Sequence, residues 1–231
     1  MTTVIIMAGG NGKRMNSDLP KVLHHVEGVP MIVRIIREAH QFGSPRILIV
    51  VGKNREAIET VIQESCETAI VNKITYIFQS VPKGTGHAAM CCLPHLHMNE
   101  RVLILSGDTP YIKAETMALM SQGSYGAFNK IRVMTDEKKV NCGVYFTTGR
   151  ILMMRLPFLS NSNAESKYHL EDIVKSINVN KDMDVDIEFL EVPFSRESLE
   201  ILYSKEIPSS KDPCKTELVK SANTQDDDTP F

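Results

Sequence analysis

Short apolar runs alternate with amphipathic segments along the first half of the chain. Strands that alternate with helices at this pitch predict a parallel sheet with helices on both faces and right-handed crossovers. The apolar runs with the composition of buried strands are 4–7, 46–51, 74–78 and 101–105. The segments with helical spacing are 31–43, 55–64 and the run that begins at Thr85.

The clearest of these helices follows Pro30. Its apolar residues recur at positions 31, 32, 35, 36 and 39, which is the spacing of one helix face. Pro30 suits the start of a helix, and Gly43 suits the position just after its end. The pattern therefore predicts a helix that buries one face against the sheet.

The second half of the chain has a weaker pattern. Residues 125–139 are polar and irregular, which predicts a loop. The strand expected at 140–146 contains Gly143, which marks either a bulge or the close approach of a ligand. The remaining predicted elements are helices at 113–121, 150–158, 170–177 and 197–205 and a strand at 186–192.

The last residues differ in composition from the rest of the chain. From Pro208 the sequence is polar and ends in QDDDTPF, which is typical of a disordered tail. The predicted organisation is therefore one domain over residues 1–207 and a tail over 208–231. With 231 residues and 42% apolar content, such a domain can bury a substantial core.

Composition excludes several classes of protein. No apolar run approaches the roughly 20 residues of a membrane-spanning helix, and no secretory signal precedes the first strand. The five cysteines are odd in number and form no C-x-x-C pair, which favours free thiols over disulfides or a zinc site. We therefore expect a cytoplasmic protein in a reducing compartment.

Charge argues against nucleic acid as a partner. The net charge is −2, and lysine and arginine are scattered along the chain, whereas a nucleic-acid binder concentrates them on one face. Any anion that this protein binds is expected to be small.

The first candidate site is the glycine-rich stretch after the first strand, within VIIMAGGNGKRMNSDLPK (4–21). Successive N–H groups in such a loop can bind an anion, and Arg14 and Lys21 add positive charge. The stretch fits neither known phosphate loop: a P-loop requires glycine at Met7, and a dinucleotide fingerprint requires glycine or alanine at Met15. The alternative is an ordinary turn with solvated basic residues.

Two further strand ends carry candidate residues. After the third strand, Gly84 and Thr85 open a helix and offer donors to an anion, while Gln79 can read the edge of a base. The alternative there is a capped loop with a surface glutamine. After the fourth strand, Asp108 is placed to bind a divalent metal or, alternatively, to cap the helix at 113–121. Ligands of parallel sheets bind at the carboxyl ends of strands, so these motifs are expected to meet.

Together these motifs, MAGGNGKRM…PK, QSVPKGTGHA and LSGDTP, resemble those of the sugar-phosphate nucleotidyltransferases. The similarity is greatest to the uridyltransferase domain of bacterial N-acetylglucosamine-1-phosphate uridyltransferase and runs from about Thr3 to Asp172. The resemblance implies a Rossmann-like three-layer α/β/α fold with a mostly parallel mixed sheet. It also implies transfer of a uridylyl group from UTP to N-acetylglucosamine 1-phosphate, which gives UDP-N-acetylglucosamine and pyrophosphate.

The resemblance also implies roles for individual residues. Asp108 would ligate Mg²⁺, and Arg14 and Lys21 would lie on the phosphates. The residues that would contact the nucleotide are Met7, Ala8, Gly9, Gly10, Gly12, Gln79, Gly84 and Thr85, and those that would contact the sugar side are Gly107, Gly126 and Asn141.

Several features depart from the family pattern. The shortened region between Asp108 and Asn141 has no counterpart of the glutamate that holds the amino sugar. No asparagine in PFSRESLEIL (193–202) supplies a second metal ligand, Ser106 replaces an aromatic residue, and no β-helix of the kind that trimerises the bacterial enzyme is present. The alternatives are therefore a transferase for another hexose 1-phosphate or nucleotide, or a regulatory protein that binds nucleotide sugars.

Overall fold

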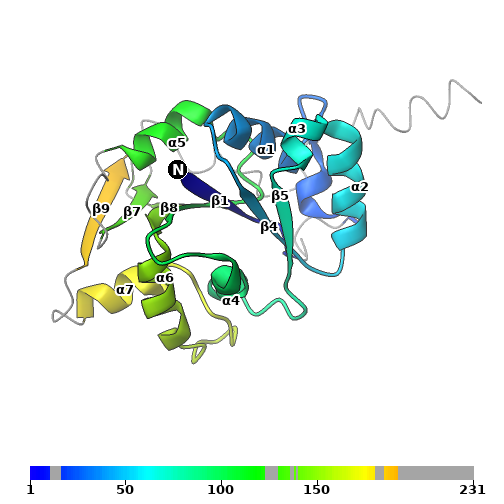
Figure 1. The fold of residues 1–231 in the computed structure, drawn as a ribbon. Helices are drawn as coiled ribbons and strands as arrows, with labels where there is room; N and C mark the ends of the chain where they lie inside the picture. Colours follow the sequence, from blue (N-terminus) through cyan, green and yellow to red (C-terminus); the bar gives the residue numbers. More distant parts are fainter. Residues whose placement is uncertain (11–16, 123–129, 136–137, 139, 180–184, 192–231) are drawn as a thin grey trace, which may run out of the picture.

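A seven-stranded sheet forms the centre of the computed structural model, which describes residues 1–10, 17–122, 130–135, 138, 140–179 and 185–191. The strand order is β5-β4-β1-β6-β8-β7-β9 (Figure 1). Only β8 runs antiparallel to its neighbours. This confirms the mostly parallel mixed sheet. The strands are β1 (Thr2–Met7), β4 (Ile47–Val51), β5 (Ile74–Phe78), β6 (Arg101–Ser106), β7 (Lys130–Thr135), β8 (Asn141–Thr148) and β9 (Asp186–Glu191).

Helices cover both faces of the sheet (Figure 1), which confirms the three-layer α/β/α architecture. The period-two alternation of β1 divides the core: Val4 and Ile6 pack on one side and Ile5 on the other. The first side is covered by α1 (Met31–Gln41), α2 (Arg55–Ser65), α3 (Thr68–Val71) and α5 (Ala114–Ser121). The second is covered by α4 (Thr85–Cys92), α6 (Gly149–Arg155) and α7 (Asp172–Val179).

The helix predicted after Pro30 is α1. Ile32, Ile35 and Ile36 are completely buried, as the spacing required. Gly43 has a φ of +84°, and its N–H donates to the His40 carbonyl, so the glycine closes the helix in a left-handed conformation. A short hairpin of β2 (His25–Val26) and β3 (Val29–Pro30) precedes α1, after the 3₁₀ turn η2 (Lys21–Leu23). Two further 3₁₀ turns are η3 (Leu93–His95) and η4 (Leu156–Phe158).

The prediction of a loop over 125–139 is wrong for part of that range, because β7 occupies Lys130–Thr135. Because Arg132 is charged, the sequence pattern did not indicate a strand here, although the Arg132 side chain is buried. Its guanidinium donates to the last carbonyls of α5, including Met120 O at 2.6 Å, and forms an ion pair with Glu188 of β9. An arginine whose charge is paired and hydrogen-bonded is tolerated inside a domain. Its polarity was therefore a poor indicator of a surface loop.

Gly143 lies at an irregularity of the β7–β8 pairing. Its φ is +73°, and the register shifts between Val133 and Thr135 of the facing strand. The bulge interpretation is therefore confirmed. The predicted helix at 197–205, the end of the strand expected at 186–192 and the tail at 208–231 lie outside the described residues. Within the described part of the chain, no helix is both long and apolar enough to cross a membrane.

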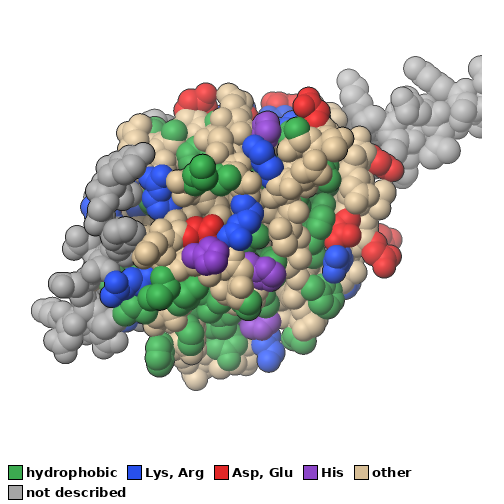
Figure 2. All heavy atoms as spheres, in the orientation of Figure 1, with side chains coloured by type: hydrophobic (Ala, Val, Ile, Leu, Met, Phe, Trp, Pro, Cys, Tyr) green, Lys and Arg blue, Asp and Glu red, His purple; other side chains and the backbone are tan. Residues whose placement is uncertain are grey.

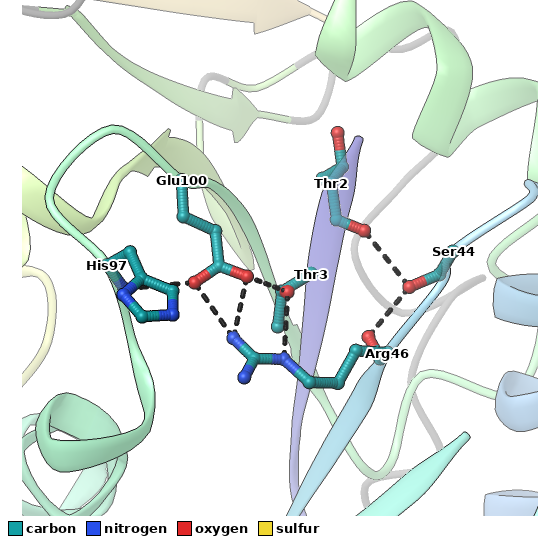
Figure 3. A network of polar contacts seen from close by, with 6 residues as sticks. All are labelled: Thr2, Thr3, Ser44, Arg46, His97 and Glu100. Carbon is teal, nitrogen blue, oxygen red and sulfur yellow. Dashed lines mark hydrogen bonds and ion pairs between the residues drawn. The ribbon is translucent and has the colours of Figure 1, made fainter. Parts of the chain in front are cut away.

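A polar network joins the amino ends of the three central strands (Figure 3). The Glu100 carboxylate, in the loop before β6, accepts hydrogen bonds from the Thr3 hydroxyl, the His97 N–H at 3.1 Å and Arg46 Nη2 at 2.6 and 2.8 Å. Ser44 Oγ donates to the carbonyls of Thr2 and Arg46. In Figure 2, histidine, acidic and basic side chains lie close together near the centre of the face shown.

We expect Glu100→Gln to reduce stability at neutral pH by about 1–3 kcal/mol, because charged hydrogen bonds inside a partly buried network are lost. Burial raises the pKa of Glu100, but the hydrogen bonds from Thr3 and His97 and the charge of Arg46 outweigh it and lower the pKa below 4.5. Stabilisation by the carboxylate is therefore present above pH 4.5 and lost as the pH falls through the lower folded-state pKa. Urea unfolding at pH 7 and at low pH measures this: the difference between wild type and variant should shrink in acid, and a constant difference would contradict the assignment.

Candidate active site

The candidate residues meet at one edge of the sheet. Strands β5, β4, β1 and β6 all end there, and the antiparallel β8 begins there. Neighbouring strands are about 4.8 Å apart, so this edge extends over roughly 20 Å. In spatial order it presents Gln79, Gly52, Ala8, Asp108 and Asn141. The convergence expected of a parallel sheet is therefore found.

Two close approaches of the backbone require glycine at this edge. Gly107 N–H donates to Met7 O at 2.9 Å, and a Cβ at Gly107 would lie only 2.6 Å from that oxygen. A Cβ at Gly52 would lie 3.0 Å from Gly9 O. The ends of β4, β1 and β6 are consequently held together without side chains between them.

The glycine-rich loop is described only in part. Ala8 N–H donates to Val50 O at 2.8 Å, which fixes the first residue beyond β1. Gly10 is exposed, and nothing lies within 4 Å of the position of a Cβ. Gly12 and Arg14 of this loop, and the predicted sugar contact Gly126, lie outside the described residues.

The Asp108 carboxylate is paired with Lys21. Lys21 Nζ donates to Asp108 Oδ2 at 2.7 Å, and Ser106 Oγ donates to Oδ1. Both charged side chains are largely but not fully buried, with 14% and 23% of the Lys21 and Asp108 side chains exposed. The structure therefore joins the first and third predicted motifs through an ion pair with access to solvent.

The alternative role of Asp108 as a helix cap is wrong. The helix begins at Ala114, and its N-terminal N–H donates to Glu38 Oε2 at 2.9 Å. Glu38 comes from α1, so the cap is a contact between distant segments. Asp108 therefore does not cap this helix, and its carboxylate can serve another role.

Asp108 fits one type of magnesium site. Among the described residues, no three His, Cys, Asp or Glu side chains lie close enough to form a complete protein cage for a metal. Magnesium is usually bound by one or two carboxylates together with substrate phosphates and water. A single accessible carboxylate beside the end of β1, where the glycine-rich stretch begins, suits that arrangement.

Arg34 of α1 forms hydrogen bonds with both the loop that follows Asp108 and the β2–β3 hairpin that follows Lys21. Its Nη1 donates to Val26 O and its Nε to Pro110 O, each at 3.2 Å. The guanidinium carbon also lies 5.5 Å from the centre of the Tyr111 ring. These contacts hold the segments that carry the ion pair at a fixed separation.

Gln79 is buried at the end of β5, with 4% of its surface exposed. Its backbone N–H donates to Val51 O at 2.8 Å. Its side-chain Nε2 lies 3.3 Å from Gly84 O and 2.9 Å from His87 Nδ1. The expected alternative of a surface glutamine is therefore wrong.

The Gly84–Thr85 turn is clamped by a segment more than 80 residues away in sequence. Gly86 N–H donates to Tyr168 O, and Tyr168 N–H donates to Lys83 O, both at 2.8 Å. Thr85 Oγ1 accepts the N–H of Leu170 at 3.0 Å. The Thr85 hydroxyl thus holds this segment in place.

Asn141 is fixed by its own strand. Its Nδ2 donates to the Tyr145 hydroxyl at 2.7 Å, and its Oδ1 accepts the Gly143 N–H at 2.8 Å. Among the described residues nothing else bonds this side chain, which leaves one amide hydrogen and one oxygen lone pair for a ligand. The bulge at Gly143 therefore orients the predicted sugar contact.

Sequence reasoning missed three residues at this edge of the sheet, which are Gly52, His87 and Tyr168. Gly52 directly follows a predicted strand and could have been found by the same rule as the other strand ends. His87 stacks on Tyr168, with ring centroids 6.3 Å apart and an interplanar angle of 27°. No local signal predicts that contact.

Comparison with known proteins gives consistent matches. The chain matches the MobA-like NTP transferase domain over residues 4–161. It is 33% identical over 211 residues to a probable UDP-N-acetylglucosamine pyrophosphorylase of Acanthamoeba polyphaga mimivirus, and the match covers 76% of this chain and 81% of that protein. It is also 33% identical over 205 residues to the bifunctional protein GlmU of Nitrosococcus oceani, which covers 75% of this chain and 44% of GlmU. The chain thus spans less than half the length of GlmU.

Solved structures share the fold. A nucleotidyl transferase from Methanothermobacter superposes with a TM-score of 0.70 at 13% identity, covering 96% of this chain and 99% of that one. The inositol-1-phosphate CTP transferase from T. maritima superposes with a TM-score of 0.62 at 18% identity, covering 99% and 98%.

Proposed function

The chain belongs to the MobA-like NTP transferase family, which agrees with the resemblance of its motifs to sugar-phosphate nucleotidyltransferases, and we propose that it transfers a uridylyl group from UTP to N-acetylglucosamine 1-phosphate. The products are UDP-N-acetylglucosamine and pyrophosphate. The observation that carries the proposal is the alignment of Gln79, Ala8 at the end of β1, the Lys21–Asp108 pair and Asn141 along one sheet edge. The relative named as a probable UDP-N-acetylglucosamine pyrophosphorylase supports the choice of substrates.

The reaction needs no base from the protein. A phosphate oxygen of the sugar 1-phosphate is already anionic at neutral pH and attacks the α-phosphorus of UTP. The bond between that phosphorus and the oxygen bridging to the β-phosphate breaks, and pyrophosphate leaves with the bonding electrons. The site must therefore align the two substrates and stabilise the charge on the leaving group.

The residues divide by role. Lys21 and Arg14 neutralise phosphate charge, and the backbone N–H groups of the glycine loop hold phosphate oxygens. Gln79, Gly84 and Thr85 form the base side of the site, and Asn141 with Gly107 lies on the sugar side. Asp108 would hold Mg²⁺, which would supply positive charge to the phosphates of both substrates.

A pyrophosphate-release assay tests the proposal. Purified chain is incubated with UTP and N-acetylglucosamine 1-phosphate in the presence and absence of Mg²⁺, and formation of UDP-N-acetylglucosamine is followed by chromatography. We expect turnover that requires Mg²⁺ and both substrates. No product at high enzyme concentration would contradict the proposal, and UDP-sugar binding without turnover would instead indicate a regulatory protein.

A transferase with a different substrate is the second candidate. The shortened region between Asp108 and Asn141, with no counterpart of the glutamate that holds the amino sugar, favours it. The same assay with a panel of hexose 1-phosphates and of UTP, dTTP, CTP and GTP distinguishes the two. If another nucleotide or hexose 1-phosphate gives a higher kcat/KM, that compound is the substrate in place of UTP or N-acetylglucosamine 1-phosphate.

A further inference from the structure

The Gln79 carboxamide has a defined orientation. Gly84 O can only accept a hydrogen bond, so the Gln79 atom 3.3 Å from it must be the NH₂ nitrogen. The same nitrogen faces His87 Nδ1 at 2.9 Å, so Nδ1 must accept as well. His87 is then the neutral tautomer that carries its proton on Nε2.

The rest of the surroundings favours this state of His87. Burial, and secondarily the charge of Lys83, lower the pKa of His87 below 6.5, so the ring is neutral at physiological pH. The stacked Tyr168 ring holds the plane of the imidazole, and Tyr168 is itself bonded to Lys83 and Gly86 on either side of Gly84. The acceptor that orients Gln79 is therefore fixed on two sides.

The oxygen of the carboxamide points the other way. Oε1 lies 3.0 Å from the position that a Cβ would have at Gly9, at the end of β1. Within the described residues, the Gln79 side chain has no hydrogen bond other than those of Nε2. A residue with only 4% of its surface exposed thus directs an unpaired acceptor at Gly9, where the glycine-rich stretch begins.

We propose that His87 is a positioning residue that fixes the Gln79 carboxamide with Oε1 toward the nucleotide, so that the site selects a pyrimidine with an N3–H over cytosine. The inference rests on the proposed function, since it takes the nucleobase to bind beside Gln79. Uracil presents N3–H as a donor to the fixed oxygen. Cytosine has a lone pair at N3 and carries its donor on N4, so two acceptors face each other and Oε1 is left unpaired.

Two substitutions at His87 distinguish the effect of the Nδ1 acceptor from the effect of the aromatic ring. His87→Phe keeps an aromatic ring against Tyr168 but removes the Nδ1 acceptor, which frees the carboxamide to turn over. His87→Asn places an amide oxygen near Nδ1 and keeps an acceptor for Gln79. Dissociation constants for UTP and CTP, measured by calorimetry with Mg²⁺ and without sugar phosphate, report base selection in the absence of turnover.

We expect wild type to bind UTP on the order of 10- to 100-fold more tightly than CTP, because a buried polar group left unpaired is penalised by about that factor. His87→Phe should reduce the UTP/CTP ratio about tenfold, mainly through weaker UTP binding, and His87→Asn should restore most of it. Purely structural damage would weaken both nucleotides in proportion and lower the melting temperature.

The tautomer provides a measurement on the unmodified protein. Nitrogen chemical shifts of the His87 ring in ligand-free wild type should show a protonated Nε2 and an unprotonated Nδ1 at pH 7.5. The Nδ1–H tautomer, equal binding of UTP and CTP by wild type, binding of neither, or an unchanged ratio in His87→Phe would each overturn the inference. Failure of the proposed function has a different signature, because it would abolish pyrophosphate release while leaving the binding ratio and the tautomer in place.

Discussion

Replacing Asp108 with asparagine is expected to lower kcat by about 10²- to 10³-fold, the usual cost of removing one charged group that stabilises a transition state. Asparagine keeps the size of the side chain and can still accept from Lys21 or Ser106. It lacks the negative charge that would hold Mg²⁺ and that balances Lys21, 2.7 Å away. The pyrophosphate-release assay measures the loss at saturating UTP and sugar phosphate.

Stability should change much less than activity. The ion pair retains some exposure at both partners, so its loss should lower the free energy of unfolding by only about 1 kcal/mol. Glu115→Gln removes the same charge from an exposed position on α5 and should leave kcat unchanged. A kcat for Asp108→Asn within about threefold of wild type would rule out the metal-binding role.

A double variant distinguishes the two roles of Asp108. In Lys21→Gln with Asp108→Asn, both charges of the pair are removed, so no charge is left unpaired. If Asp108 only balanced Lys21, the double variant would lack the phosphate contact of Lys21, but its residual activity would still depend on the Mg²⁺ concentration. If Asp108 holds the metal, as proposed, the double variant stays at least as impaired, and its residual activity no longer depends on the Mg²⁺ concentration.

The strand ends of the site were predictable because local pattern and topology agree there. A continuous apolar run of five residues such as 47–51 is typical of a buried strand in a parallel sheet, and parallel strands bring their carboxyl ends to one edge. That rule placed Gln79 and Asp108 at the same edge without any knowledge of contacts. The fold class therefore follows from periodicity and from the order of the elements.

The errors share one physical cause, which is pairing between distant segments. Arg132 marks a strand as polar until Glu188, 56 residues later, pairs with it. Asp108 was a reasonable helix cap until Glu38 of α1 took that position. The clamp of Tyr168 on Gly84 is of the same kind. Such partners are chosen by the folded arrangement, and no local propensity encodes them.

Gly84→Ala tests this clamp and is expected to lower the free energy of unfolding by about 2–4 kcal/mol. The residue has a φ of +99°, which strains any side chain, and an added Cβ would lie 2.4 Å from Tyr168 O. That oxygen cannot retreat without losing its hydrogen bond from Gly86. Because Gly84 O also holds the Gln79 carboxamide, UTP affinity should fall about tenfold or more in the fraction that remains folded.

Gly28→Ala separates backbone strain from steric overlap. Gly28 has a comparable φ of +79°, in the β2–β3 turn, but nothing lies within 4 Å of its Cβ position. This variant should lose only about 1 kcal/mol and keep its affinity for UTP. Thermal and urea unfolding with nucleotide titration of both variants measure the difference, which is the contribution of the contact with Tyr168. Equal losses of unfolding free energy in the two variants would mean that the Tyr168 segment moves aside at little cost. Such a segment could not hold His87 and Gln79 in the orientation that base selection requires.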